Sequence, residues 1–305
     1  MPRLLPKNVY SISGDSDIDR IMVNEDKLQL IPQSEWIDLR DIYKVDWPKH
    51  EMAYNTIQNY INWVKIDSRI KHLKIYSLSD SWRDNGTYII VDRYQMFFYS
   101  IEESNESLGR ALRLIDWDYS YKICYIRKCH RSALDLVLKS ASIELQWETF
   151  TYLYHLPKEE SLKFEINLPD GLRLKRLQAE HAITANNIWP HRCEGSEYFL
   201  KRLAVWNISI GLFNESDKLV AWCFCWQTGA MGPLEVAPEH LRKGYGTIMV
   251  KAIARELANN GLNCYGTVLC TNKASQGMFE KLGFKRVDGH YYVRNQPRKL
   301  VEWAC

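Results

Sequence analysis

The sequence predicts an α/β protein whose second half is a mixed sheet flanked by helices. Strand-like and helix-like segments alternate along the chain, which is typical of an α/β fold. The run from Pro233 to Thr247 passes from a short apolar strand through a Gly-x-Gly corner into a helix. A second run, from Thr271 to Phe284, adds an Asn turn, a short amphipathic helix and an exit into another strand.

Length and composition narrow the class of protein. The 305 residues are enough for two domains. A net charge of +3 from 40 basic and 37 acidic residues gives no support for a nucleic-acid surface. The eight cysteines form no Cys-x-x-Cys pair and the histidines no zinc spacing, so we expect free thiols, a reducing compartment and no metal.

Neither a membrane span nor a secretory signal is predicted. No stretch approaches the roughly 18 apolar residues of a membrane span, so no membrane partner is expected. Residues 1–20 lack the apolar core of a secretory signal. We therefore expect an intracellular protein, and the choice between cytoplasm and mitochondrion stays open.

The first half shows both helical and strand periodicities. Apolar residues at positions 53, 57, 60, 61 and 64 predict a helix over 52–65. Segments rich in Tyr, Ile, Val and Phe predict strands over 74–78, 87–92 and 95–101. A helix over 108–115, a strand over 122–126, a helix over 130–142 and a strand over 150–156 follow.

The polar segment 156–161 interrupts this pattern, so we predict an N-terminal α/β domain over residues 1–160 and a second domain over 161–305. The second domain is predicted to contain a strand over 172–177, helices over 181–189 and 197–205, and paired strands over 208–213 and 219–227. Residues 168–305 are expected to form one mixed sheet. The strand pair at 87–92 and 95–100 raises the alternative that the first domain is a degenerate copy of the second.

Cys223 and Cys225 alternate on the second of those paired strands. Residues two apart on a strand point to the same face, so both are expected to be buried free thiols on one side of the sheet.

The glycine corner predicts an anion site. The N–H groups at a helix start lack intrahelical partners, and the helix dipole adds positive potential there. Arg242 and Lys243 add positive charge beside Gly244. Gly244 and Gly246 alone are equally consistent with plain turn glycines. The Asn-turn segment about 25 residues downstream favours a ligand that carries phosphate.

These motifs follow the order found in the acyl-CoA-dependent N-acyltransferases of the GNAT superfamily, which residues 230–290 resemble closely. The whole chain resembles the glycine N-acyltransferase family. The residues that carry this resemblance are Trp47-Pro48, Ile115-Asp116-Trp117, 132–141, Trp226-Gln-Thr-Gly229, Pro238 to Gly244, Asn272 and Pro297-Arg298 followed by Trp303. That family transfers an acyl group from acyl-CoA to the amine of glycine or another small amino acid.

The resemblance implies a site for acyl-CoA or acetyl-CoA. Leu234 and Val236 would pair with the pantetheine arm through their backbone groups, and the Leu234 N–H would polarise the thioester carbonyl. A plain core strand is compatible with that role, because it uses only backbone atoms. Asn272 and Ser275 would contact the far part of CoA. The pyrophosphate would be held by the backbone N–H groups of Arg242, Lys243, Gly244, Tyr245, Gly246 and Thr247.

Three positions depart from the family pattern. Leu241 replaces a frequent Gln or Arg, Ala230 occupies the family's base position, and Phe279 replaces a Tyr that often serves as the acid. The base is therefore unknown.

Either water or another side chain, such as Glu235, Glu239 or His240, would then act as the base. Strand alternation predicts that Glu235 faces away from Ala230 unless a bulge intervenes. His240 lies in the phosphate turn and is expected at the surface.

The early helices and the tail would supply the acceptor pocket, so Trp189, His191 and Arg192 are candidates there. Arg192 would pair with a substrate carboxylate, and a plain surface arginine is the alternative. Three functions stay open: amino-acid N-acylation, acyl-CoA binding with weak or lost catalysis, and peptide or protein N-acetylation on the same fold. The oligomeric state is open as well.

Overall fold

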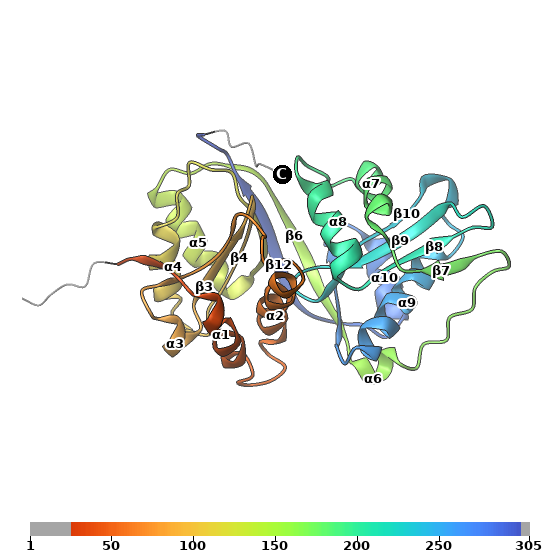
Figure 1. Ribbon diagram of the computed structural model, residues 1–305, viewed down its shortest axis with the longest axis horizontal. Helices are drawn as coiled ribbons and strands as arrows, with labels where there is room; N and C mark the ends of the chain where they lie inside the picture. The colour runs from red at the N-terminus through yellow and green to blue at the C-terminus, as the bar shows by residue number, and fades with distance from the viewer. Residues whose placement is uncertain (1–25, 300–305) are drawn as a thin grey trace, which may run out of the picture.

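The computed structural model describes residues 26–299. The N-terminal segment 1–20 and Trp303, both used above, lie outside these residues. One twelve-stranded sheet runs through the described chain in the order β1-β2-β3-β4-β5-β12-β6-β11-β10-β9-β8-β7 (Figure 1). Its strands are β1 (Leu28–Leu30), β2 (Leu73–Leu78), β3 (Tyr88–Asp92), β4 (Gln95–Tyr99), β5 (Lys122–Arg127), β6 (Leu145–Leu156), β7 (Arg173–Lys175), β8 (Ser209–Phe213), β9 (Leu219–Cys225), β10 (Ala230–Val236), β11 (Cys264–Leu269) and β12 (Lys285–Asn295).

Helices cover both faces of the sheet. They are α1 (Trp36–Ile42), α2 (Glu51–Ile66), α3 (Trp82–Asn85), α4 (Glu106–Arg113), α5 (Lys128–Ser140), α6 (Lys158–Ser161), α7 (Ala179–Ile188), α8 (Ser196–Trp206), α9 (Tyr245–Asn259) and α10 (Lys273–Lys281), with short 3-10 turns at Gln33–Glu35 and Pro238–His240. The predicted α/β class is confirmed, and each of the helices and strands predicted above is found near its expected place. The regularly spaced apolar side chains that predicted these elements form the faces that the elements bury.

The strand order differs from the expectation that residues 168–305 form a sheet of their own. β6, from the first half, pairs antiparallel with β11, and β12, from the second half, pairs antiparallel with β5. The order is palindromic, because each strand lies opposite the strand six places along the chain. Each half thus receives the last strand of the other. A sequence pattern shows that a strand is amphipathic or apolar, and it does not show which partner completes its hydrogen bonds.

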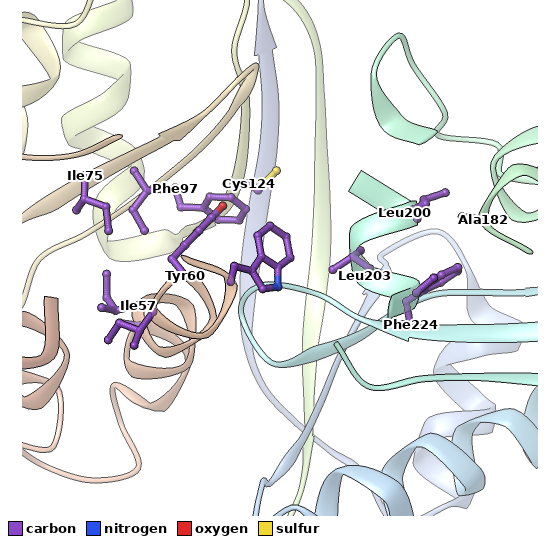
Figure 2. Packing of buried hydrophobic residues seen from close by; sticks show 14 of the residues in the cluster. Ile57, Tyr60, Ile75, Phe97, Cys124, Ala182, Leu200, Leu203 and Phe224 are labelled. Carbon is purple, nitrogen blue, oxygen red and sulfur yellow. The ribbon is translucent and has the colours of Figure 1, made fainter. Parts of the chain in front are cut away.

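One hydrophobic core spans the two halves on the face covered by α2, α7 and α8. It joins Ile57 and Tyr60 of α2 with Leu200 and Leu203 of α8, and Figure 2 shows them on either side of the central strands. The opposite face has two cores, one under α9 and α10 and one under α4 and α5. Cys223 and Cys225 are buried in the α9 core, as predicted, and both are free thiols.

Polar contacts also tie the halves together. Arg202 of α8 pairs with Asp92 of β3 at 3.1 Å, and both side chains are buried. Burial raises the pKa of Asp92 to about 6, against the opposing charge of Arg202. Glu51 of α2 accepts hydrogen bonds at 2.8 Å from the Asn263 amide and the Tyr265 hydroxyl. The predicted boundary at 160/161 falls at the short helix α6 and remains a prediction.

Candidate functional site

The site lies where two parallel strands separate. β10 and β11 pair only at Ala230–Tyr265 and Met231–Gly266, and β10 then follows β9 instead. A cavity of about 490 Å³ lies in this opening and extends to the first half of the chain. Leu234, Asn272 and Ser275 line it, so three of the residues implied by the resemblance meet at one cavity.

The glycine corner has the geometry expected of an anion site. Gly244 has φ +80° and caps α9, and a Cβ placed there would meet no other atom within 4 Å. Within residues 26–299, the N–H groups of Arg242, Lys243 and Gly244 have no hydrogen-bond acceptor. The N–H groups of Thr247 and Ile248 donate to the Gly244 carbonyl, at 3.1 and 3.3 Å. The corner therefore offers uncommitted N–H groups beside the positive end of a helix.

A β-bulge reverses the parity that the sequence predicts for β10. Met231 is opposite Cys225 and Leu234 is opposite Cys223, so β10 has one extra residue between those two pairs. Met231, Leu234 and Val236 consequently pack together in the α9 core. Glu235 lies on the other face of the strand, the face that Ala230 shares.

The expected orientation of Glu235, away from Ala230, is therefore corrected by the bulge. Gly232 marks the irregular position, with φ +141° and the Trp226 indole so close that a Cβ would overlap it. A bulge of this kind redirects every side chain that follows it.

Glu235 has the electrostatics of a base. Its half-buried carboxyl group lines the cavity, and burial raises its pKa to about 7. It forms no ion pair with any residue between 26 and 299. Its carboxylate is therefore available to accept a proton near neutral pH.

The other base candidates lie outside the cavity. Glu239 is exposed and pairs with Lys218 at 2.8 Å, and this hydrogen bond lowers its pKa. The His240 ring stacks on Tyr245, with ring centroids 6.1 Å apart. Both residues belong to the anion corner rather than to the opening between β10 and β11.

Of the three positions that depart from the family pattern, Ala230 and Phe279 are packed and Leu241 is exposed. Ala230 is fully buried against Leu153 and Tyr265. Phe279 lines the cavity and packs on Phe284, with centroids 4.8 Å apart, and it carries no proton to donate.

Asn272 also has a local structural role. Its side chain accepts a hydrogen bond of 3.0 Å from the Ser275 N–H and so caps α10. Both side chains remain at the cavity wall. This cap accounts for the Asn at the turn that the sequence analysis singled out.

At one end, the cavity wall is formed by aromatic and positively charged side chains. Trp189, His191 and Arg192 line it, as the sequence analysis expected for an acceptor pocket. The Arg192 guanidinium donates to the Asn187 carbonyl, so part of its donor capacity is used inside the protein. Lys122 of β5 and Trp147 of β6 also line this end. Sequence reasoning missed both, because they come from the other half of the chain and belong to no local motif.

No helix between residues 26 and 299 is long and apolar enough to cross a membrane. Over the same range, no group of three or more His, Cys, Asp or Glu side chains is arranged to hold a metal ion.

Comparisons with known proteins identify the fold. Residues 209–293 match the model of the FR47-like protein family. A Drosophila protein solved by structural genomics is 23% identical, with a TM-score of 0.81, and the match covers 90% of this chain and all of that one. A tandem GNAT protein from the clavulanic acid biosynthesis pathway is 11% identical, with a TM-score of 0.56 and coverage of 90% and 100%.

A GCN5-related N-acetyltransferase from Sphaerobacter thermophilus is 12% identical, with a TM-score of 0.52 and coverage of 89% and 95%. At these identities the likeness concerns the fold. The chain has the fold of these GNAT proteins.

Proposed function

We propose that this protein transfers an acyl group from acyl-CoA to the amine of glycine or another small amino acid. The observation that carries the proposal is Glu235, a carboxyl group with a pKa of about 7 at the cavity between β10 and β11. Acylation of an amine needs the neutral amine, and a carboxylate with this pKa can take up the proton at neutral pH. The family's usual base position is Ala230, and the bulge brings Glu235 to the same face of the strand.

The residues present fit CoA as the acyl donor. The open corner at Gly244 offers N–H groups to a pyrophosphate, and Arg242 and Lys243 are exposed beside it. The separation of β10 from β11 leaves room for the pantetheine arm along Leu234. Bound acyl-CoA would supply the acyl group as a thioester. A metal has no part in the proposed chemistry.

The chain's own residues account for the transfer as follows. Glu235 removes a proton from the acceptor's ammonium group, and the freed electron pair forms the new C–N bond. The Leu234 N–H donates to the carbonyl oxygen as negative charge develops on it. The C–S bond then breaks, and the nitrogen loses its second proton to solvent, which gives the neutral amide. The proton held by Glu235 passes through solvent to the released thiolate. Phe279 has no proton to give, and a thiolate is a sufficiently weak base to leave without an acid.

Free-CoA release, followed with a thiol reagent, tests the proposal. Acetyl-CoA and longer acyl-CoA esters are combined with glycine, other amino acids and short peptides. Release that depends on glycine or another small amino acid is expected. Calorimetric binding of CoA without release for any acceptor would indicate a binding protein and contradict the proposal. Release with peptides alone would indicate a peptide N-acetyltransferase and would contradict it as well.

A further inference from the structure

Lys122 is a half-buried cation that lines the same end of the cavity as Trp189. Its ammonium group lies 5.0 Å from the ring centroid of Trp189 and 5.9 Å from that of Trp147. These aromatic faces attract the cation without neutralising its charge. Lys122 and Trp147 come from the first half of the chain and Trp189 from the second, so the pocket exists only in the assembled fold.

The ammonium group of Lys122 has no anionic partner in the described chain. Between residues 26 and 299, its Nζ forms no ion pair and donates no hydrogen bond. An ammonium group carries three donors, so all three remain available to a ligand. Arg192, the residue that the sequence suggested for this task, already donates to a backbone carbonyl.

Lys122 also lies near the start of the proposed catalytic strand. In the sheet register it is the parallel partner of Gln95, and the Gln95 side chain accepts a hydrogen bond of 2.7 Å from Gln227. Gln227 belongs to the tight turn that leads into β10 at Ala230. Lys122 and Leu234 line the same cavity.

The neighbouring imidazole adds little positive charge near neutral pH. Desolvation lowers the pKa of His191, and the charge of Lys122 lowers it further. The imidazole is therefore mainly neutral at pH 7. At this end of the cavity Lys122 has all of its donors free, whereas Arg192 has given one to a backbone carbonyl, so the complementary ligand group is an anion.

We infer that Lys122 binds the carboxylate of the acceptor, so that the site selects amino acids over uncharged amines. The inference rests on the proposed function, because it assigns the acceptor end of that site. A charge-assisted hydrogen bond in a cavity that excludes part of the solvent is stronger than a neutral one. Lys122 is therefore a specificity-determining residue contributed by the first half of the chain to the reaction in the second.

Kinetics with matched acceptors test this inference. Lys122→Met keeps most of the aliphatic stem that packs on the tryptophans and removes the charge. For glycine, the KM is expected to rise about tenfold or more, with a smaller change in kcat. The KM for acyl-CoA is expected to stay unchanged, and so is the rate with glycinamide, which lacks the carboxylate. Lys122→Arg should restore much of the glycine affinity.

Lys128→Met is the matched control. Lys128 lies on α5, contacts the ring of Phe150 at 5.4 Å, and lines neither this cavity nor the one in the first half. This variant should have wild-type kinetics with both acceptors. A thermal unfolding midpoint for each variant separates loss of fold from loss of recognition.

A binding measurement separates failure of the inference from failure of the proposed function. N-acetylglycine and N-acetylglycinamide are titrated into CoA-saturated protein and followed by saturation-transfer NMR. Wild type should bind the carboxylate compound more tightly, and Lys122→Met should abolish the difference. Equal binding of both compounds by wild type, or an unchanged preference in Lys122→Met, would overturn the inference even if the enzyme acylates amines. Absence of CoA release with the preference intact would contradict only the proposed function.

Discussion

The molecule contains two clefts of the same construction and different chemistry. In the first half β4 and β5 pair only at Gln95–Lys122 and Met96–Ile123, just as β10 and β11 share only two pairs in the second. Cavities of about 400 and 490 Å³ lie at the two openings. Equal strand geometry therefore does not decide what a cleft binds.

The starts of the two following helices differ most. α9 begins after Gly244, with φ +80° and free space around the Cα. α4 begins after Asn105, with φ +55°, and its first turn is already occupied, because the Glu102 carboxylate accepts a hydrogen bond of 2.8 Å from the Ser107 N–H. The chain's own carboxylate takes the place that an anion would need. The corner at Gly244 is thus open, and the corner at Asn105 is already filled by the chain's own carboxylate.

The polar side chains of the two clefts differ in the same way. In the first half, Arg127 pairs with Asp288 at 3.2 Å and donates to the Tyr99 hydroxyl, which also bonds to His50 at 2.8 Å. At the second cleft, which is lined by Glu235 of the second half and Lys122 of the first, neither side chain has an ion-pair partner within the described range. Polar groups that already have partners inside the protein stabilise the fold, and those without such partners are available to a substrate.

The largest effect is expected at Glu235, and Glu102 serves as the comparison. Glu235→Gln should lower kcat by about 10²–10⁴-fold, because the amide cannot take the proton. Glu102→Gln should leave kcat unchanged, because it lies at the other cleft. Initial rates of CoA release from purified variants give both numbers. A fully active Glu235→Gln enzyme would assign the base elsewhere.

The pH dependence of kcat/KM sharpens the same assignment. Only the unprotonated carboxylate is a base, so below the pKa of Glu235 the rate should fall with falling pH. The rate should rise through about pH 7 and level off above it. This rise should be absent from the residual activity of Glu235→Gln. A profile with the same midpoint in both proteins would attribute it to another group.

A smaller effect is expected at the helix starts. Gly244→Asp should weaken CoA binding on the order of 100-fold, because the left-handed φ strains the new side chain and its charge repels phosphate. Asn105→Gly, the reciprocal change in the first half, should leave CoA affinity and a stoichiometry of one CoA per chain unchanged. Isothermal calorimetry measures both quantities. Wild-type affinity in Gly244→Asp would remove the pyrophosphate from this corner.

The smallest effect is on stability alone. Glu102→Ala should lower the free energy of unfolding by about 1 kcal/mol, because the Ser107 N–H loses its acceptor at the start of α4. Urea unfolding compares this variant with Glu103→Ala, an exposed neighbour. Equal midpoints would mean that Glu102 does not cap the helix, and the difference between the two corners would then need another cause.

Local patterns in the sequence predicted the parts of the site that are local in the chain. The anion corner, the Asn272 turn and the strand at Leu234 each consist of neighbouring residues, and their backbone conformations follow from glycine, asparagine and apolar alternation. Of the proposed acceptor pocket, the sequence predicted only the residues that follow α7: Trp189, His191 and Arg192.

The sequence by itself determined the α/β class, the order of the elements and the corner that fits a phosphate, because each depends on short-range geometry. Only the tertiary structure decided three further points: that β6 and β12 are exchanged between the halves, that a bulge turns Glu235 toward the face of Ala230, and that Lys122 lines the cavity beside Trp189. The physical reason is common to all three. Strand partners and register depend on contacts between distant segments, and a shift of one residue changes which face every later side chain occupies.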